Sequence, residues 1–237
     1  MKIQYKKENE ISHIIMDDGK ANAMNAAFFD QMEKSLDETE KDKSRILVIS
    51  GRQGFFSGGL DLRLLPTLSP SELDAFMETF SRVMLRVYSF PIPTIAILTG
   101  HAIAGGFILS LSCDVIAALD GPFKIQMNEV KNGIPLPSWM ISVASSVIPV
   151  QWQREALLHA RAYSPREAMD RNILDALLKD GSQIPAFIQA TAKEFLTLNL
   201  PSYTITKKRM REPIVTQGLE LLKGELLGSL ASGIKMS

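Results

Sequence analysis

The spacing of apolar positions divides the first part of the chain into strands and a helix. The first sixteen residues predict two short strands with a turn near Asn9. Residues 25–40 place four apolar side chains on one helical face, and RILVIS (residues 45–50) is a short apolar run typical of a buried strand. A glycine-rich connection over residues 51–66 follows that strand. Strands that feed helices in this way are the beginning of an α/β pattern.

Two matching signals predict later helix starts. SPSE, beginning at Ser69, and SPRE, beginning at Ser164, each have the form of a capping box with proline at the first helical position. Between and after them, the further predicted elements are a strand in PTIAILTG (residues 93–100), a helix in AGGFILSLSC (104–113), and strands in DVIAALD (114–120) and DALLKD (175–180).

The alternation of strands and helices predicts an α/β core over residues 1–183, with largely parallel, buried strands. Residues 184–237 form a second region that is helical to the end, with interruptions at Pro201 and Pro213. Because this helical region cannot bury its apolar faces alone, we expect it to pack on the core or on another subunit.

One stretch, from Pro91 to Cys113, carries neither acidic nor strongly basic side chains and is long enough to cross a membrane. Two prolines and three glycines interrupt it, so we interpret it as a buried strand, a turn and a buried helix. No membrane partner is therefore expected.

Composition narrows the class of function. Lys+Arg and Asp+Glu are both 26 in 237 residues, so no charge excess points to nucleic acid or to an anionic membrane surface. The single cysteine and three scattered histidines exclude an intrachain disulfide and predict no metal site. A chain with these features and without a recognisable leader is expected in a reducing cytoplasm.

Three glycine-containing segments stand at the ends of predicted strands or the starts of helices: FFSGGLDL (residues 55–62), GHAIAGGF (100–107) and MNEVKNGIPLP (127–137). Each segment alone is typical of a turn, but ligands of α/β sheets bind at such edges, so the ordered set predicts a site. The chain contains no serine-hydrolase elbow, P-loop or dinucleotide fingerprint, so serine hydrolase, nucleotidase and dehydrogenase functions lack support.

With DDGKANAMN (residues 17–25), these segments make the chain similar to the enoyl-CoA hydratase/isomerase, or crotonase, family from about Met16 to Leu178. The resemblance implies a crotonase-like spiral of ββα units with a C-terminal helical appendage. It also implies an acyl-CoA thioester substrate, no cofactor apart from the coenzyme A of that substrate, and homotrimers or hexamers.

The resemblance further implies catalytic roles for three residues. Leu60 and Gly105 would offer main-chain amides to the thioester oxygen, and Glu129 would act as the base. The physics agrees with this assignment: Gly58 and Gly59 allow close approach to a ligand, and Gly105 stands at a helix start where N–H groups are free. Two such amides form an oxyanion hole for an enolate.

The remaining substrate contacts also come from the resemblance. The ANA backbone is expected at the adenine, and Lys20, Arg63 and Lys207 or Lys208 are candidates for the phosphates. The full predicted substrate-binding set is Lys20, Ala21, Ala23, Gly58, Gly59, Leu60, Asp61, Leu62, Arg63, Gly105, Gly106, Ile108, Ile134 and Leu136.

Four other polar side chains in or near these segments are expected to have structural roles. Asp61 and Asp114 are interpreted as carboxylates that bind backbone N–H groups. Cys113 is expected to be a buried core thiol, and His101 is not expected to be catalytic.

Ile108 decides which chemistry we predict. It occupies the position of the first of the two glutamates used by the family's hydratases, and isoleucine neither exchanges a proton nor orients water. One carboxylate suffices to move a double bond, and Phe107, Ile108, Ile134 and Leu136 would keep the site dry. The sequence therefore predicts a 3-enoyl to 2-enoyl-CoA isomerase. The open alternatives are a hydratase, another crotonase-type lyase or hydrolase, and a non-catalytic acyl-CoA-binding relative.

Overall fold

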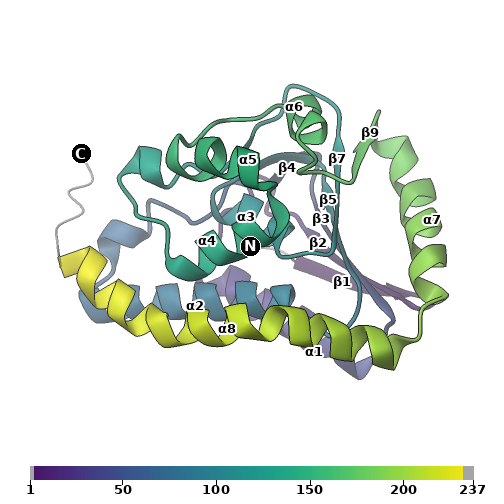
Figure 1. Cartoon of the computed structure of the whole chain (residues 1–237), viewed down its shortest axis with the longest axis horizontal. Helices are drawn as coiled ribbons and strands as arrows, with labels where there is room; N and C mark the ends of the chain where they lie inside the picture. Colours follow the sequence, from purple (N-terminus) through teal and green to yellow (C-terminus); the bar gives the residue numbers. More distant parts are fainter. Residues whose placement is uncertain (1–2, 232–237) are drawn as a thin grey trace.

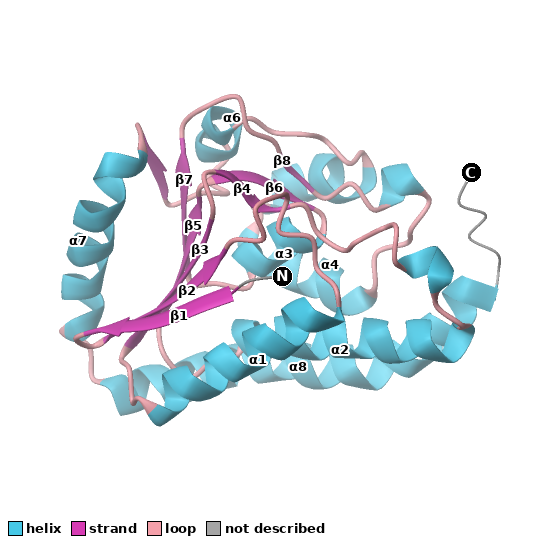
Figure 2. Ribbon diagram, turned by 180° about the vertical axis from the view of Figure 1, so that it is seen from behind, coloured by secondary structure: helices cyan, strands magenta, loops and turns pink. Residues whose placement is uncertain are grey.

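The computed structural model describes residues 3–231, which form two sheets surrounded by helices (Figures 1 and 2). The larger sheet has the strand order β1-β2-β3-β5-β7-β9 and the smaller sheet has the order β4-β6-β8. Strand pairs are parallel except for the β1–β2 hairpin. The strands are β1 (Ile3–Glu8), β2 (Ile11–Met16), β3 (Ile46–Gly51), β4 (Gly54–Ser57), β5 (Thr94–Leu98), β6 (Gly100–Ile103), β7 (Val115–Leu119), β8 (Ile125–Gln126) and β9 (Ala176–Leu178).

Both predicted capping boxes are present: the hydroxyls of Ser69 and Ser164 accept hydrogen bonds from the backbone N–H groups of Glu72 and Glu167. The α-helices are α1 (Ala26–Lys41), α2 (Pro70–Tyr88), α3 (Gly105–Leu111), α4 (Ser138–Val147), α5 (Val150–Gln153), α6 (Pro165–Asp170), α7 (Ile184–Leu196) and α8 (Leu200–Ala231). The shorter turns are the 3₁₀ turns η1 (Leu65–Thr67), η2 (Val130–Asn132) and η4 (Gly181–Gln183) and the π-helical turn η3 (Arg154–Leu158).

Three successive ββα units build the core: β3-β4-α2, β5-β6-α3 and β7-β8-α4. In each unit the first strand joins the larger sheet and the second joins the smaller sheet. The predicted connection over residues 51–66 therefore contains β4, and the segment that begins at Gly100 contains β6. The smaller sheet is built from strands of only four, four and two residues, too short for a sequence period to reveal.

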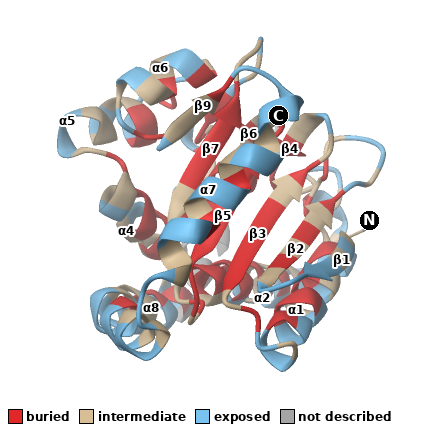
Figure 3. Cartoon of the chain, turned by 90° about the vertical axis from the view of Figure 1, so that its right-hand side faces the viewer, coloured by how far each residue is buried: buried red, intermediate tan, exposed pale blue. Residues whose placement is uncertain are grey.

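The central strands β3, β5 and β7 of the larger sheet are buried on both faces, which explains their continuous apolar runs. In β3, Leu47 and Ile49 point to the main core formed with α1–α4, whereas Ile46 and Val48 point to a second core beneath α7. Figure 3 shows α7 crossing the sheet on this second face. The α/β prediction is confirmed, with strands buried as expected.

The stretch from Pro91 forms the expected strand (β5) and helix (α3), but the segment predicted as a turn contains a second strand, β6. Within residues 3–231, no helix combines the length and apolar character that crossing a bilayer requires.

The C-terminal helical region is interrupted beside only one of its two prolines, since α7 ends at Leu196 and α8 begins at Leu200. Pro201 lies in the first turn of α8, where its missing N–H costs nothing, and Pro213 lies exposed inside the same helix. Packing holds α8 on both sides of Pro213, through Lys207 and Arg211 before it and Gly218 against Trp139 after it. The prediction of an interruption at Pro213 was therefore wrong, and α8 lies along α2 and α4 (Figure 1).

Candidate active site

The three predicted catalytic residues follow the three strands of the smaller sheet. Leu60 comes shortly after β4, Gly105 directly follows the turn after β6, and Glu129 comes shortly after β8. The strands are parallel and adjacent in the order β4-β6-β8, so their carboxyl ends share one edge. Neighbouring strands lie about 4.8 Å apart, so this sheet gathers the three segments at one place.

The loop after β4 is held by neighbouring amides that leave one N–H free. Gly58 N donates to Ala21 O at 2.8 Å, and Asp61 N donates to Met24 O at 3.0 Å. Gly59 has a φ of +82°, and a Cβ there would lie 2.9 Å from Gly105 N. In the described part of the chain, the N–H of Leu60 has no acceptor.

The turn after β6 presents a second free amide. Ala104 has φ 51° and ψ −122°, a conformation that costs an L-residue energy, and it places Gly105 at the first position of α3. The first N–H groups of a helix have no partner within it, and no described acceptor serves Gly105 N. Two unpaired N–H groups therefore come from loops in direct contact.

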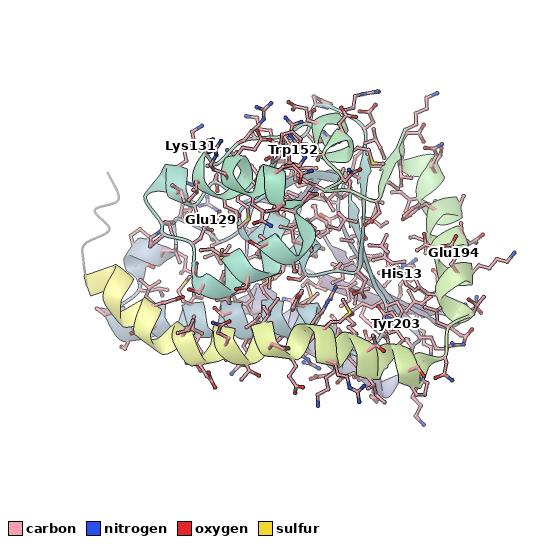
Figure 4. All side chains as sticks on the ribbon, viewed as in Figure 1. His13, Glu129, Lys131, Trp152, Glu194 and Tyr203 are labelled. Atoms are coloured by element: carbon pink, nitrogen blue, oxygen red, sulfur yellow. The ribbon has the colours of Figure 1, made fainter. Side chains whose placement is uncertain are left out.

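Glu129 is a buried carboxylate at the start of η2 (Figure 4). Its side chain is 8% exposed, and no donor in the described residues reaches its buried Oε2. Burial raises the pKa of Glu129 from 4.5 to about 7. Its backbone is fixed, because Glu129 O accepts from Asn132 N and Ile134 N, each at 2.9 Å. Such a group can accept or release a proton near neutral pH.

A cavity of about 850 Å³ lies beside the Glu129 turn. Its walls are the loop of residues 130–136, α4, α5 and η3, and the predicted lining residues Ile134 and Leu136 both border it. Phe107 and Ile108, the other two predicted lining residues, are fully buried in the main core. We refer to this space as the side cavity.

The ANA segment is joined to the first glycine motif by a residue that sequence reasoning passed over. Asn22 is fully buried with a φ of 50°, and its Nδ2 donates to Met16 O, Phe55 O and Phe56 O. Asparagine tolerates this left-handed conformation better than most residues, which is the signal that could have found it. Ala21 and Ala23 are half-buried beside it.

The remaining predicted substrate contacts lie mostly at the surface. Lys20 and Leu62 are exposed, as is the side chain of Arg63, which pairs with Asp61 at 3.2 Å. Asp61 also accepts from Arg63 N at 3.2 Å, so its predicted turn role is confirmed. A Cβ on Gly106 would lie 2.3 Å from Ser57 O, so this glycine sets the packing of α3 on β4.

Lys207 is not available to a phosphate, which corrects one candidate. Its side chain is 5% exposed, and its Nζ donates to Asp114 Oδ2 at 2.6 Å and to Ile92 O at 3.0 Å. Asp114 also pairs with Arg211 at 2.8 Å and accepts from Thr94 N at 2.8 Å. The prediction failed because the contact that buries Lys207 joins residues 93 positions apart.

The structural roles expected for Cys113 and His101 agree with their surroundings. Cys113 is buried, and burial raises the pKa of its thiol to about 12. His101 Nδ1 accepts from Lys124 N at 2.9 Å, and its ring lies between those of Phe55 and Phe123.

Comparison with known proteins agrees with this geometry. The model of the enoyl-CoA hydratase/isomerase family matches residues 6–226, nearly the whole chain. The chain belongs to this family. Its two-sheet core is accordingly the crotonase fold expected from the sequence.

Individual members of the enoyl-CoA hydratase/isomerase family resemble the chain at modest identity. Human mitochondrial enoyl-CoA delta isomerase 1 is 26% identical over 194 residues, which are 81% of this chain and 64% of the human protein. A solved enoyl-CoA hydratase from Mycobacterium marinum is 26% identical, with a TM-score of 0.85 over 94% of this chain and 99% of that one. Relatives at the same identity thus carry both names.

The solved human mitochondrial Δ3-Δ2-enoyl-CoA isomerase has a TM-score of 0.93, covering 99% of this chain and 93% of its own, at 22% identity. This match supports the family fold, while the reaction has to be argued from the site.

Proposed function

We propose that this enzyme moves the double bond of a 3-enoyl-CoA thioester to the 2-position, with Glu129 as its single base. The observation that carries the proposal is the Glu129 carboxylate, which is buried, free at Oε2 and has a pKa raised to about 7. A desolvated carboxylate is a stronger base than a solvated one, and a pKa near neutrality lets it both take and return a proton.

Glu129 alone can carry out both proton transfers of this reaction. Glu129 removes a proton from C2, the C3–C4 double bond shifts to C2–C3 through a dienolate, and the same proton returns at C4. The free amides of Leu60 and Gly105 would hold the negative thioester oxygen of the dienolate. Each such donor is worth about 3–4 kcal/mol in the transition state, because it is already oriented when charge develops.

Ile108 favours isomerisation over hydration. Adding water to a double bond requires a group that activates water as well as one that handles the C2 proton. Ile108 stands where hydratases of the family are expected to carry the first glutamate, and it is fully buried in the apolar core. A dry, apolar site would also keep the Glu129 carboxylate basic, which a proton shuttle needs.

The test is an assay of purified protein with 3-hexenoyl-CoA and crotonyl-CoA, comparing wild type with Glu129→Gln. We expect wild type to convert the 3-enoyl thioester and Glu129→Gln to lose about 10²–10⁴-fold in kcat. Glu78→Gln, on an exposed glutamate of α2, is the matched control and should retain activity. A wild type that hydrates crotonyl-CoA and leaves 3-hexenoyl-CoA unchanged would refute the proposal.

A further inference from the structure

The side cavity has a mixed wall whose polar side chains lie together. The loop side is apolar, with Val130, Ile134 and Leu136. The helical part of the wall carries Ser145, Gln153 and Arg154, from α4, α5 and η3, together with the apolar Ile141, Val150, Leu157 and Leu158. The cavity is thus mainly apolar, and its polar end is where Ser145, Gln153 and the exposed Arg154 lie.

Two hydrogen bonds hold the Gln153 side chain in place. Gln153 Nε2 donates to Ser145 O at 3.0 Å and to Ile148 O at 2.9 Å, so α5 is clamped to the C-terminal end of α4. Leu136 lies just before the other end of α4. At 1.5 Å per residue, Ser138 and Ser145 are about 10 Å apart along the helix axis. The polar end of the cavity therefore lies at the opposite end of α4 from Leu136.

Arg154 is a cation without a counterion at this polar end. In the described part of the chain it makes no ion pair or side-chain hydrogen bond. Its neighbour Glu155 is committed elsewhere, with Arg171 at 2.6 Å and Arg161 at 3.7 Å. Arg171 in turn lies over the Trp152 ring at 4.8 Å.

Helical spacing puts three residues of the turn η3 on the side of the cavity. Residues Arg154, Leu157 and Leu158 of this turn all border the cavity, whereas Glu155 pairs with Arg171 outside its lining. Single π-turns occur often at functional sites, because they redirect side chains within a helix. Here the turn presents one guanidinium among apolar side chains.

We infer that the side cavity receives the acyl chain of the thioester and that Arg154 binds a carboxylate at the far end of that chain. The substrate class is then ω-carboxyl 3-enoyl thioesters, and this inference rests on the proposed function. A volume of about 850 Å³ is within the size range of small-molecule sites.

Charge complementarity selects this occupant. Arg154 is exposed, so a methyl-ended chain in the cavity would leave its guanidinium in water and gain no polar contact from it. A carboxylate replaces that water with a charge-assisted, two-pronged pair, the geometry for which arginine is suited.

Binding of saturated thioesters tests the inference without requiring turnover. Titration calorimetry would compare dodecanoyl-CoA with its ω-carboxyl analogue on wild type, Arg154→Leu and Lys131→Leu. Lys131 is the matched control, an exposed cation next to Val130 that does not line the cavity; Figure 4 shows it near the edge of the molecule. We expect wild type to bind the ω-carboxyl thioester about tenfold more tightly or better. Arg154→Leu should lose that preference and Lys131→Leu should keep it.

Several outcomes would overturn the inference. Equal affinity of wild type for both thioesters would refute it, as would equal loss of preference in Arg154→Leu and Lys131→Leu. If a second copy of the chain covers the cavity instead, Arg154→Leu should change the association state in sedimentation and leave both affinities unchanged. Assays with the 3-enoyl forms of both thioesters separate the role of Arg154 from the proposed function. If the protein prefers to bind the ω-carboxyl thioester but isomerises neither, only the proposed reaction is refuted. If it isomerises the 3-enoyl thioesters without preferring the ω-carboxyl form, only the role of Arg154 is refuted.

Discussion

Replacing Glu129 with glutamine should stabilise the protein by an amount that grows as the pH rises from about 4.5 to about 7. Burial raises the pKa of Glu129 from 4.5 to about 7 in the folded chain, whereas in the unfolded chain the carboxyl ionises at its ordinary pKa. As the pH rises between these values, the unfolded state releases its proton first and gains free energy over the folded state. Wild-type stability therefore falls through this window, and glutamine, which does not ionise, removes that loss.

The magnitude follows from the two pKa values. At about 1.4 kcal/mol for each pKa unit, the rise from 4.5 to about 7 corresponds to about 3 kcal/mol of lost stability above neutrality. At pH 5.5 only about 1 kcal/mol of this stability is lost. The carboxyl is already ionised in the unfolded chain at this pH, but the pH is only one unit above its unfolded pKa of 4.5. The advantage of Glu129→Gln should thus grow by about 2 kcal/mol from pH 5.5 to pH 8.5 and then remain constant.

Urea denaturation at fixed protein concentration, repeated across this pH range, measures the difference. Glu78→Gln provides the control, because an exposed carboxyl should leave the pH dependence of wild type unchanged. A difference between Glu129→Gln and wild type that stays constant with pH would refute the reasoning. It would mean that Glu129 ionises like a solvated carboxyl and lacks the basicity on which the proposed reaction depends.

Three further predictions follow from the same structure. The kcat/KM for a 3-enoyl thioester should rise with pH to about 7 and level off above, since only ionised Glu129 accepts a proton; a flat profile would contradict this. Gly59→Ala should lower kcat about 10²-fold in steady-state assays, because its Cβ would meet Gly105 N at 2.9 Å and displace the loop; wild-type kinetics would contradict this. Lys207→Met should lower the free energy of unfolding by about 3 kcal/mol, because it breaks the buried pair with Asp114, and should leave coenzyme A affinity unchanged. Loss of affinity at wild-type stability would restore the phosphate role.

Several features of the chain could be predicted because their causes are local. The two capping boxes begin α2 and α6 through bonds that span three residues, so Ser69 and Ser164 carry the information themselves. The apolar face of α1 needs only helical spacing. The family resemblance of the glycine motifs pointed to Leu60 and Gly105, and local chemistry agrees with it, because glycines allow close backbone approach and a helix start leaves N–H groups free.

Other features depend on residues that meet only in the folded chain. The two- and four-residue strands of the smaller sheet carry no period of their own, yet their pairing places the segments of Leu60, Gly105 and Glu129 along one edge. Burial raises the pKa of Glu129 and shields Lys207 from solvent, and it is produced by side chains that are far away in the sequence. Sequence patterns alone thus determined the chemical groups and the local elements, since those depend on neighbours in the chain. Tertiary packing decided which groups are dry, paired or free, since those properties depend on neighbours in space.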